Sequence, residues 1–175
     1  MRYILTILAI TTLSFVSLGQ KQSIDKFISR LDNQQIAIVM QYAWYPKMVS
    51  PAGDSLIKIG KPATEKLISL LSDTSKGIIA HYILSNIWAD KLRRTGQELG
   101  SNVRYVENDT IAALAISYTD FIFFQDSNGH NFARQTDLDS NKDRWISFFN
   151  TNIFKQQHPS GSRLSAKPSV TKSSR

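Results

Sequence analysis

Apolar residues recur at three- and four-residue intervals along much of this chain, and that spacing places them on one face of a helix. The second such segment, for example, carries Ile36, Val39, Met40 and Ala43 on one face. The sequence is therefore expected to fold mainly into helices. The expected helices span residues 24–31, 35–44, 51–59, 62–72, 76–88, 111–118 and 141–153.

Two segments depart from the helical period. Residues 103–106 alternate in polarity like a fragment of a β-strand. Residues 121–124 are aromatic or β-branched, the turn-forming sequence Asp-Ser-Asn-Gly follows at 126–129, and a second short run covers 130–134. This order predicts a small C-terminal β-hairpin. Because four strong strand formers in a row would aggregate at an open edge, the hairpin is expected to pack its aromatic face on the helices.

The most regular segment runs from residue 50 to residue 88. Ser50 and Pro51 form a typical helix start, since the serine oxygen accepts from a free backbone N–H and proline loses no hydrogen bond at the first position. Gly60 ends that helix and Pro62 begins the next. The polar turn 73–75 then separates it from a third helix.

This order of parts resembles the HEAT-like α-solenoid repeat family over about one and a half repeats, residues 50–88. Three apolar residues of the first helix, Ala52, Leu56 and Ile59, also reappear at one constant offset in the third as Ala80, Leu84 and Ile87. The resemblance implies stacked helical pairs and a concave surface for a protein partner, and it implies no chemistry. The expected fold class is thus mainly α, with HEAT-like helical pairs, a β-hairpin and a final helix.

The two ends of the chain differ from the middle in composition. Residues 1–19 combine one arginine, an apolar run and a small-residue end, which is typical of a secretory signal peptide; an uncleaved anchor is the alternative. Residues 155–175 are rich in serine, proline and basic residues, so a disordered basic tail is expected. A single helical domain, 20–154, lies between them. The protein is expected to be exported to a bacterial periplasm or secreted, and to meet a membrane only during export.

The formal net charge of +7 comes mostly from the ends of the chain. Between residues 20 and 154 there are 15 basic and 14 acidic residues. A nearly neutral domain does not predict a nucleic-acid-binding groove. The chain contains no cysteine, which excludes disulfides, thiol catalysis and a lipoprotein-type anchor.

No cofactor, metal or catalytic motif is recognisable. The three histidines, at 81, 130 and 158, lie in separate predicted elements, and no phosphate-binding or nucleophile motif occurs. Residues 137–143 offer oxygen ligands at alternate positions, but a calcium loop that begins there would need glycine and glutamate where Lys142 and Phe148 stand. Paired carboxylates such as Asp54 with Glu65, or Asp73 with Asp90, are each explained by helix caps or turns.

These observations favour a non-enzymatic exported interaction protein that binds an envelope protein partner. The expected interaction surface is the aromatic and polar set Trp44, Tyr45, His81, Tyr82 and Asn86. The aromatic cluster at residues 42–45 also allows plain packing between helices. The alternative is an exported hydrolase or carbohydrate-binding protein whose site is built from scattered carboxylates and aromatics. An inhibitor or immunity-type protein is a third possibility, which the sequence does not separate from the first.

Overall fold

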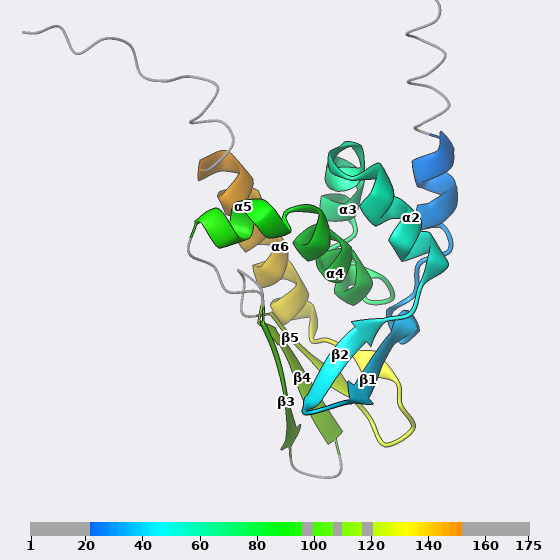
Figure 1. The fold of residues 1–175 in the computed structure, drawn as a ribbon, viewed down its shortest axis with the longest axis vertical. Coiled ribbons are helices and arrows are strands. Elements are labelled where there is room, and N and C mark those ends of the chain that lie inside the picture. The colour runs from blue at the N-terminus through cyan, green and yellow to red at the C-terminus, as the bar shows by residue number, and fades with distance from the viewer. Residues whose placement is uncertain (1–21, 96–99, 107–109, 117–120, 152–175) are drawn as a thin grey trace, which may run out of the picture.

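The computed structural model describes residues 22–95, 100–106, 110–116 and 121–151. Residues 22–28 form a first helix. The chain continues through η1 (Asn33–Gln35), β1 (Ile36–Met40), β2 (Trp44–Met48), α2 (Pro51–Ile59), η2 (Lys61–Ala63), α3 (Thr64–Ser69), α4 (Gly77–Ile87), α5 (Ala89–Arg94), β3 (Gly100–Val106), β4 (Thr110–Ile116), β5 (Phe121–Gln125), β6 (Asn131–Phe132) and α6 (Gln135–Phe149). The mainly helical class with a C-terminal hairpin and a final helix is confirmed (Figure 1).

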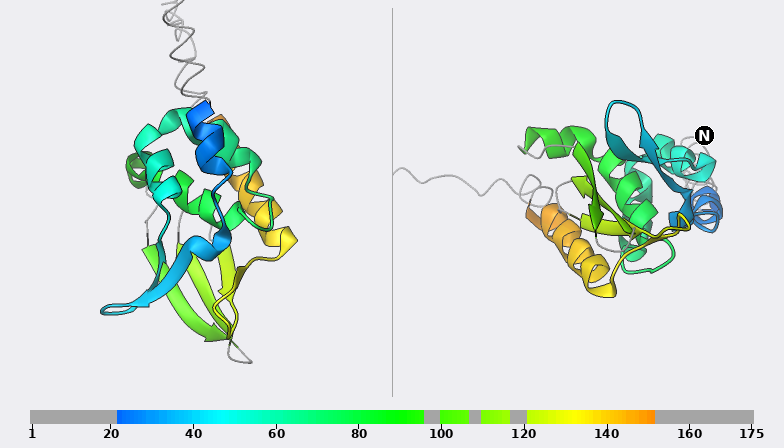
Figure 2. Two further views of the ribbon diagram at one scale, coloured as in Figure 1. Left: turned by 90° about the vertical axis from the view of Figure 1, so that its right-hand side faces the viewer. Right: turned by 90° about the horizontal axis from the view of Figure 1, so that it is seen from below.

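The β-structure is larger than the sequence predicted. Strands β3, β4, β5 and β6 form one antiparallel sheet in that order, and β1 and β2 form a separate antiparallel hairpin. The helices gather at one end of the four-stranded sheet, and the β1–β2 hairpin extends along one of its sides (Figures 1 and 2). The predicted hairpin of β5 and β6 is therefore one part of a wider sheet.

Helix α4 runs through the centre of the hydrophobic core. Its residues Ile78, Ile79, Ile83 and Leu84 are completely buried. Helices α2 and α3 both contact α4, and α6 contacts α3 and β5. The aromatic face of β5 packs on α4 as predicted, with the Phe121 ring 4.9 Å from the ring of His81.

The segment 50–88 follows its predicted boundaries closely. The Ser50 hydroxyl accepts a hydrogen bond from the Gly53 amide at 3.0 Å, and Pro51 begins α2. Gly60 ends α2 with a φ of 75°, a conformation that favours glycine. The Asp73 carboxylate accepts from the amides of Ser75 and Lys76 and so forms the turn before α4. Stacking of these helices in HEAT-like pairs stays a prediction.

Two predicted helices are strands in the structure. The helix expected at 35–44 is replaced by the end of η1, strand β1, a turn at 41–43 and the first residue of β2, and the helix expected from residue 111 is β4. The helix at 111–118 was expected because residues 108–110 resemble a helix cap and Ile111, Leu114, Ala115 and Tyr118 follow at helical spacing. Thr110–Ile116 instead lies between β3 and β5, where pairing on both edges outweighs local propensity. The strand expected at 103–106 is confirmed as part of β3.

The final helix begins earlier than predicted. Ser140 was expected to cap it, but α6 starts at Gln135, and the carbonyl of Arg134 accepts the first helical hydrogen bonds from Asp137 and Leu138. Ser140 therefore lies inside the helix. The earlier start lets Leu138, Trp145 and Phe148 all reach the core along one face.

The predicted signal peptide at 1–19 and the predicted tail at 155–175 lie outside the described residues. Within the described part of the chain, no helix combines the length and apolar character that crossing a membrane requires. The segmentation into leader, domain and tail stays a prediction.

Candidate interaction surface

The β1–β2 hairpin, residues 36–48, is called the arm below. Its register pairs Ile36 with Met48, Ile38 with Pro46 and Met40 with Trp44. Side chains alternate between the two faces of a strand, so these six residues share one face of the arm. Pro46 is tolerated because β2 pairs with a strand on one edge only.

This shared face is buried at one end of the arm and exposed at the other. Ile36 is 1% exposed and Pro46 is buried, and Ile38 and Met48 pack against the core. At the far end Met40 is 59% exposed and Trp44 41% exposed, and Tyr42 in the turn is 95% exposed. The apolar face that anchors the arm thus continues beyond the body of the protein. Met40, Tyr42 and Trp44 are called the arm tip.

Tyr82 of α4 contacts the arm. Its hydroxyl donates to the carbonyl of Pro46 at 3.4 Å, and its ring meets that of Phe123 edge to face at 6.4 Å. Burial raises the pKa of Tyr82, so the hydroxyl stays protonated and remains a donor. Near the tip, the hydroxyl of Tyr45 donates to Oε1 of Gln41 at 3.1 Å.

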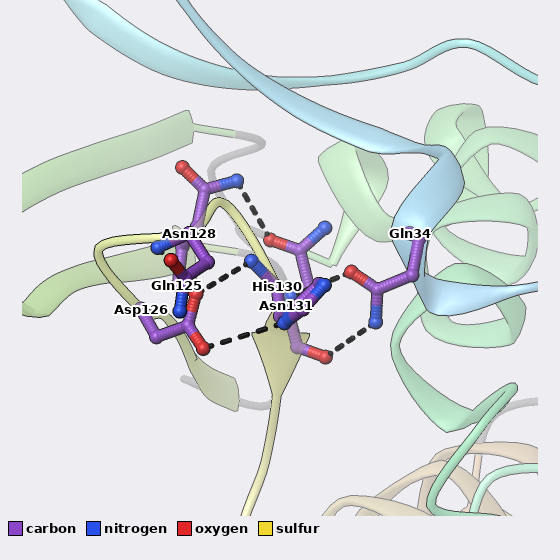
Figure 3. Close-up of polar contacts among 6 residues, drawn as sticks. All are labelled: Gln34, Gln125, Asp126, Asn128, His130 and Asn131. Carbon is purple, nitrogen blue, oxygen red and sulfur yellow. Dashed lines mark hydrogen bonds and ion pairs between the residues drawn. The ribbon is translucent and has the colours of Figure 1, made fainter.

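A polar clasp of Gln34 and Asn131 ties the base of the arm to β6 (Figure 3). The Gln34 side chain accepts from the Asn131 backbone N–H at 2.8 Å and donates to its carbonyl at 3.0 Å. The Asn131 side chain donates to the carbonyls of Asn33 and Ile36 at 2.9 and 2.6 Å. The amide of Gln34 therefore pairs with β6 much as another strand would.

Asn33 connects the same region to α4. Its side-chain oxygen accepts from the amides of Ile78 and Ile79 at 3.0 and 3.2 Å, and its side-chain nitrogen donates to the Thr74 carbonyl at 2.8 Å. The first turn of a helix leaves its N–H groups without helical partners. Asn33 supplies an acceptor for two of them from 45 residues away in the chain, which fixes the arm relative to α4.

The β5–β6 turn forms a second polar cluster beside the clasp (Figure 3). The Asp126 carboxylate accepts from the amides of Asn128 and His130 at 2.9 and 2.8 Å. The bond from the His130 amide is the first cause of a lowered Asp126 pKa. These bonds shape the turn, so the cluster is explained by structure.

His81 was predicted to be part of the interaction surface, but its side chain lies in the hydrophobic core. Only 1% of it is exposed. Its Nδ1 accepts from the Trp145 indole Nε1 at 3.1 Å, and its ring also bonds to the Asn141 side chain. Indole is only a donor, so His81 is the neutral tautomer that carries its proton on Nε2. Burial lowers its pKa to about 3.

The structure brings together three of the five residues proposed from the sequence. Trp44 and Tyr45 lie on the arm, and Tyr82 holds it. Asn86 is exposed on α4, where its side chain donates to the Tyr82 carbonyl within the same helix. Met40 and the arm as a whole were missed, because Ile36, Val39 and Met40 also satisfy a helical spacing. The β-branched content of residues 36–39 was the signal for a strand.

The described residues contain no group of three or more histidine, aspartate or glutamate side chains that could hold a metal ion. Among the described carboxyl groups, shifted pKa values belong to Asp73 and Asp126, and both are lowered. The largest cause for Asp73 is the hydrogen bond from the Ser75 side chain. A carboxyl group that acts as a general acid near neutral pH needs a raised pKa, so neither Asp73 nor Asp126 has the shift expected of one.

Comparison with known protein families, with curated proteins and with solved structures finds no match for this chain.

Proposed function

We propose that this chain is an exported, non-enzymatic interaction protein whose helical, HEAT-like body presents the arm to an envelope protein partner. The observation that carries the proposal is the exposure of the arm tip, where three large apolar side chains stand together at the end of an otherwise anchored hairpin.

Aromatic side chains are the usual energetic centres of protein interfaces. Tyr42 and Trp44 supply two large rings, and Met40 adds a flexible apolar surface beside Trp44. The single charged residue of the arm, Lys47, lies near its base. An apolar tip without charge suits a pocket or groove that excludes water.

The anchoring of the arm also supports this proposal. Tyr82 at Pro46 and Gln34 at Asn131 hold its base, so a partner would meet a hairpin that is already ordered. Binding then costs less conformational entropy than it would for a mobile loop.

Carbohydrate binding is the second candidate, because the almost fully exposed ring of Tyr42 and the half-exposed ring of Trp44 could stack on sugars. The hydrolase form of this alternative has less support, since the two shifted carboxyl pKa values among the described residues, those of Asp73 and Asp126, are both lowered. A carbohydrate site would also require polar groups beside the rings, and the hydroxyl of Tyr45 on the same arm already donates to Gln41.

The test is affinity capture of tagged protein, residues 20–175, from the envelope of the native host, followed by reconstitution with the purified candidate partner. The variant Met40→Ser with Trp44→Ser should lose the partner, whereas Ile146→Ser on α6, which changes a similarly exposed apolar residue, should retain it. Equal binding by both variants would refute the role of the arm. Capture of glycan in place of protein would favour the second candidate.

A further inference from the structure

Strand β1 has one edge that faces β2 and one edge that faces away from it. Across the first edge, the Val49 amide donates to the Gln35 carbonyl, which makes these two residues a hydrogen-bonded pair. In an antiparallel hairpin such pairs alternate with pairs whose N–H and C=O groups point outward. The outward groups of β1 are therefore those of every second residue: Ile36, Ile38 and Met40.

The outward groups at the base of β1 are already bonded. The N–H of Ile36 donates to the Asn33 carbonyl, and its carbonyl accepts from the Asn131 side chain at 2.6 Å. Further along, the described residues supply no hydrogen-bond partner to the outward N–H and C=O groups of Ile38 and Met40. Ile38 is half-buried and Met40 is 59% exposed. This part of the β1 edge is therefore open to another strand.

Two other strand edges are closed. On β2, Pro46 has no N–H, and its carbonyl accepts from the Tyr82 hydroxyl. On β6, the outward N–H and C=O of Asn131 are both bonded to the Gln34 side chain (Figure 3). Edge strands are commonly protected by proline or by charged residues. Residues 36–40, Ile-Ala-Ile-Val-Met, contain neither.

The composition of the arm indicates an uncharged strand as the occupant of this edge. No charged residue occurs between Asp32 and Lys47. A charge on an added strand would lose water beside this segment without gaining an ion pair. Strand β1 is itself uncharged and apolar, so a second copy of the chain supplies an occupant of the required chemistry.

Two copies of β1 satisfy each other's open groups in one antiparallel register. When Ile38 of each copy pairs with Met40 of the other, the outward N–H and C=O groups of both residues gain partners. The twofold axis then passes between the two copies of Val39. The pairing stops before Ile36, whose groups are already bonded. This register uses every open group on both edges.

We propose that the chain forms a twofold dimer in which the β1 edges of two copies pair antiparallel, centred on Val39, and join the two arms into one sheet. Pairing along an edge leaves the faces of a strand open, so Tyr42 and Trp44 remain available to an envelope partner. The dimer does not depend on the function proposed for the arm. Its contact is isologous and closed, so the open edge is used up without adding a third copy.

Sedimentation equilibrium of the purified chain measures the dimer. The paired edge is short, so a weak dimer is expected, with a dissociation constant of roughly 10 µM to 1 mM. Met40→Pro removes an outward N–H at an exposed residue and should weaken dimerisation at least about tenfold, whereas Met40→Leu should leave it unchanged. Ile38→Pro and Ile38→Val repeat the comparison at the other open residue. Circular dichroism first establishes that each variant is folded.

Disulfide trapping tests the register. The chain contains no cysteine, so each single-cysteine variant carries one thiol. In the dimer the two copies of Val39 form a non-hydrogen-bonded pair with Cα atoms about 4.5 Å apart, which a disulfide spans. Val39→Cys should therefore give a disulfide-linked dimer under mild oxidation with copper phenanthroline.

The matched control for trapping is Gln41→Cys. Its two thiols would lie about four residues apart along the paired strands, or roughly 13 Å, and should not join. Gln41 is exposed whereas Val39 is half-buried, so chance collision would favour the control.

Other results overturn the proposal. A chain that stays monomeric up to about 1 mM would refute the dimer. A dimer that persists in both proline variants, or trapping at residue 41 that equals trapping at residue 39, would place the contact elsewhere. If the chain is monomeric and Ile38→Pro, but not Ile38→Val, loses the captured envelope partner, the occupant of the edge is a strand of that partner.

Discussion

The indole nitrogen of Trp145 donates a hydrogen bond of 3.1 Å to Nδ1 of His81, inside the core formed by α4 and α6. The bond fixes the tautomer of the neutral histidine, and burial lowers the pKa of His81 to about 3 in the folded state. His81, which the sequence analysis assigned to a binding surface, therefore contributes to the stability of the fold.

Acid should destabilise the protein through His81. The folded pKa of about 3 lies below the ordinary value of 6.5, so protonation favours the unfolded chain and stability falls as the pH drops below about 6.5. The slope is about 1.4 kcal/mol per pH unit, which gives about 2 kcal/mol between pH 7 and pH 5. Urea denaturation at both pH values measures it.

The variant His130→Ala, which changes an exposed histidine, is the control for this titration. It should keep the same loss between pH 7 and pH 5. An unfolding free energy that is equal at the two pH values in the original chain would contradict the assignment of a buried neutral His81.

Removal of the indole donor should destabilise the core. Trp145→Phe leaves Nδ1 of His81 without that donor and creates a small cavity, with an expected loss of about 2–3 kcal/mol in unfolding free energy. Chemical denaturation monitored by far-ultraviolet circular dichroism measures the loss. Trp44→Phe, on the exposed arm tip, should change stability by less than about 0.5 kcal/mol; similar losses in both variants would count against the buried bond.

Asn33 should stabilise the start of α4 across the chain. Asn33→Ala removes the acceptor for the amides of Ile78 and Ile79, and the expected cost is about 2 kcal/mol. Hydrogen exchange of these two amides should accelerate. Asn86→Ala, an exposed asparagine later in the same helix, is the matched substitution and should leave both amides protected. Unchanged exchange in the Asn33 variant would show that the helix start does not depend on Asn33.

Gly77 should tolerate no side chain. A Cβ atom there would lie 2.6 Å from the Leu71 carbonyl oxygen and 2.7 Å from Cδ2 of Leu138, and the first of these is backbone. Gly77→Ala should therefore destabilise the protein by about 2–3 kcal/mol in a thermal or urea unfolding experiment, despite the better helix propensity of alanine. A more stable alanine variant would show that the contact between α4 and α6 is looser than described.

The accuracy of the sequence-based predictions followed the strength of local signals. Ser50, Gly60 and Asp73 act within a few residues of their own positions, and each boundary they mark is present. The arm was missed because Ile36, Val39 and Met40 fit a helical period as well as a strand. In the structure these residues pair with β2, and the Asn131 side chain, 95 residues away, donates to the Ile36 carbonyl.

The candidate site was predicted in part for the same reason. Trp44 and Tyr45 attracted attention as an aromatic cluster, and Tyr82 as a polar aromatic residue on α4. No local pattern distinguishes Tyr82 from its neighbour His81. Their environments are set by partners distant in the sequence, Pro46 for Tyr82 and Trp145 for His81.

Site-specific photo-crosslinking at residue 42 tests the central claim most directly. A benzophenone amino acid is introduced at Tyr42, the most exposed residue of the arm tip, and a second protein carries it at Arg94 on α5. The account predicts one protein adduct from residue 42 in the native envelope, displaced by excess unlabelled chain and lost with Met40→Ser and Trp44→Ser, and none from residue 94. No adduct at residue 42, or the same adducts at both positions, would contradict the role of the arm.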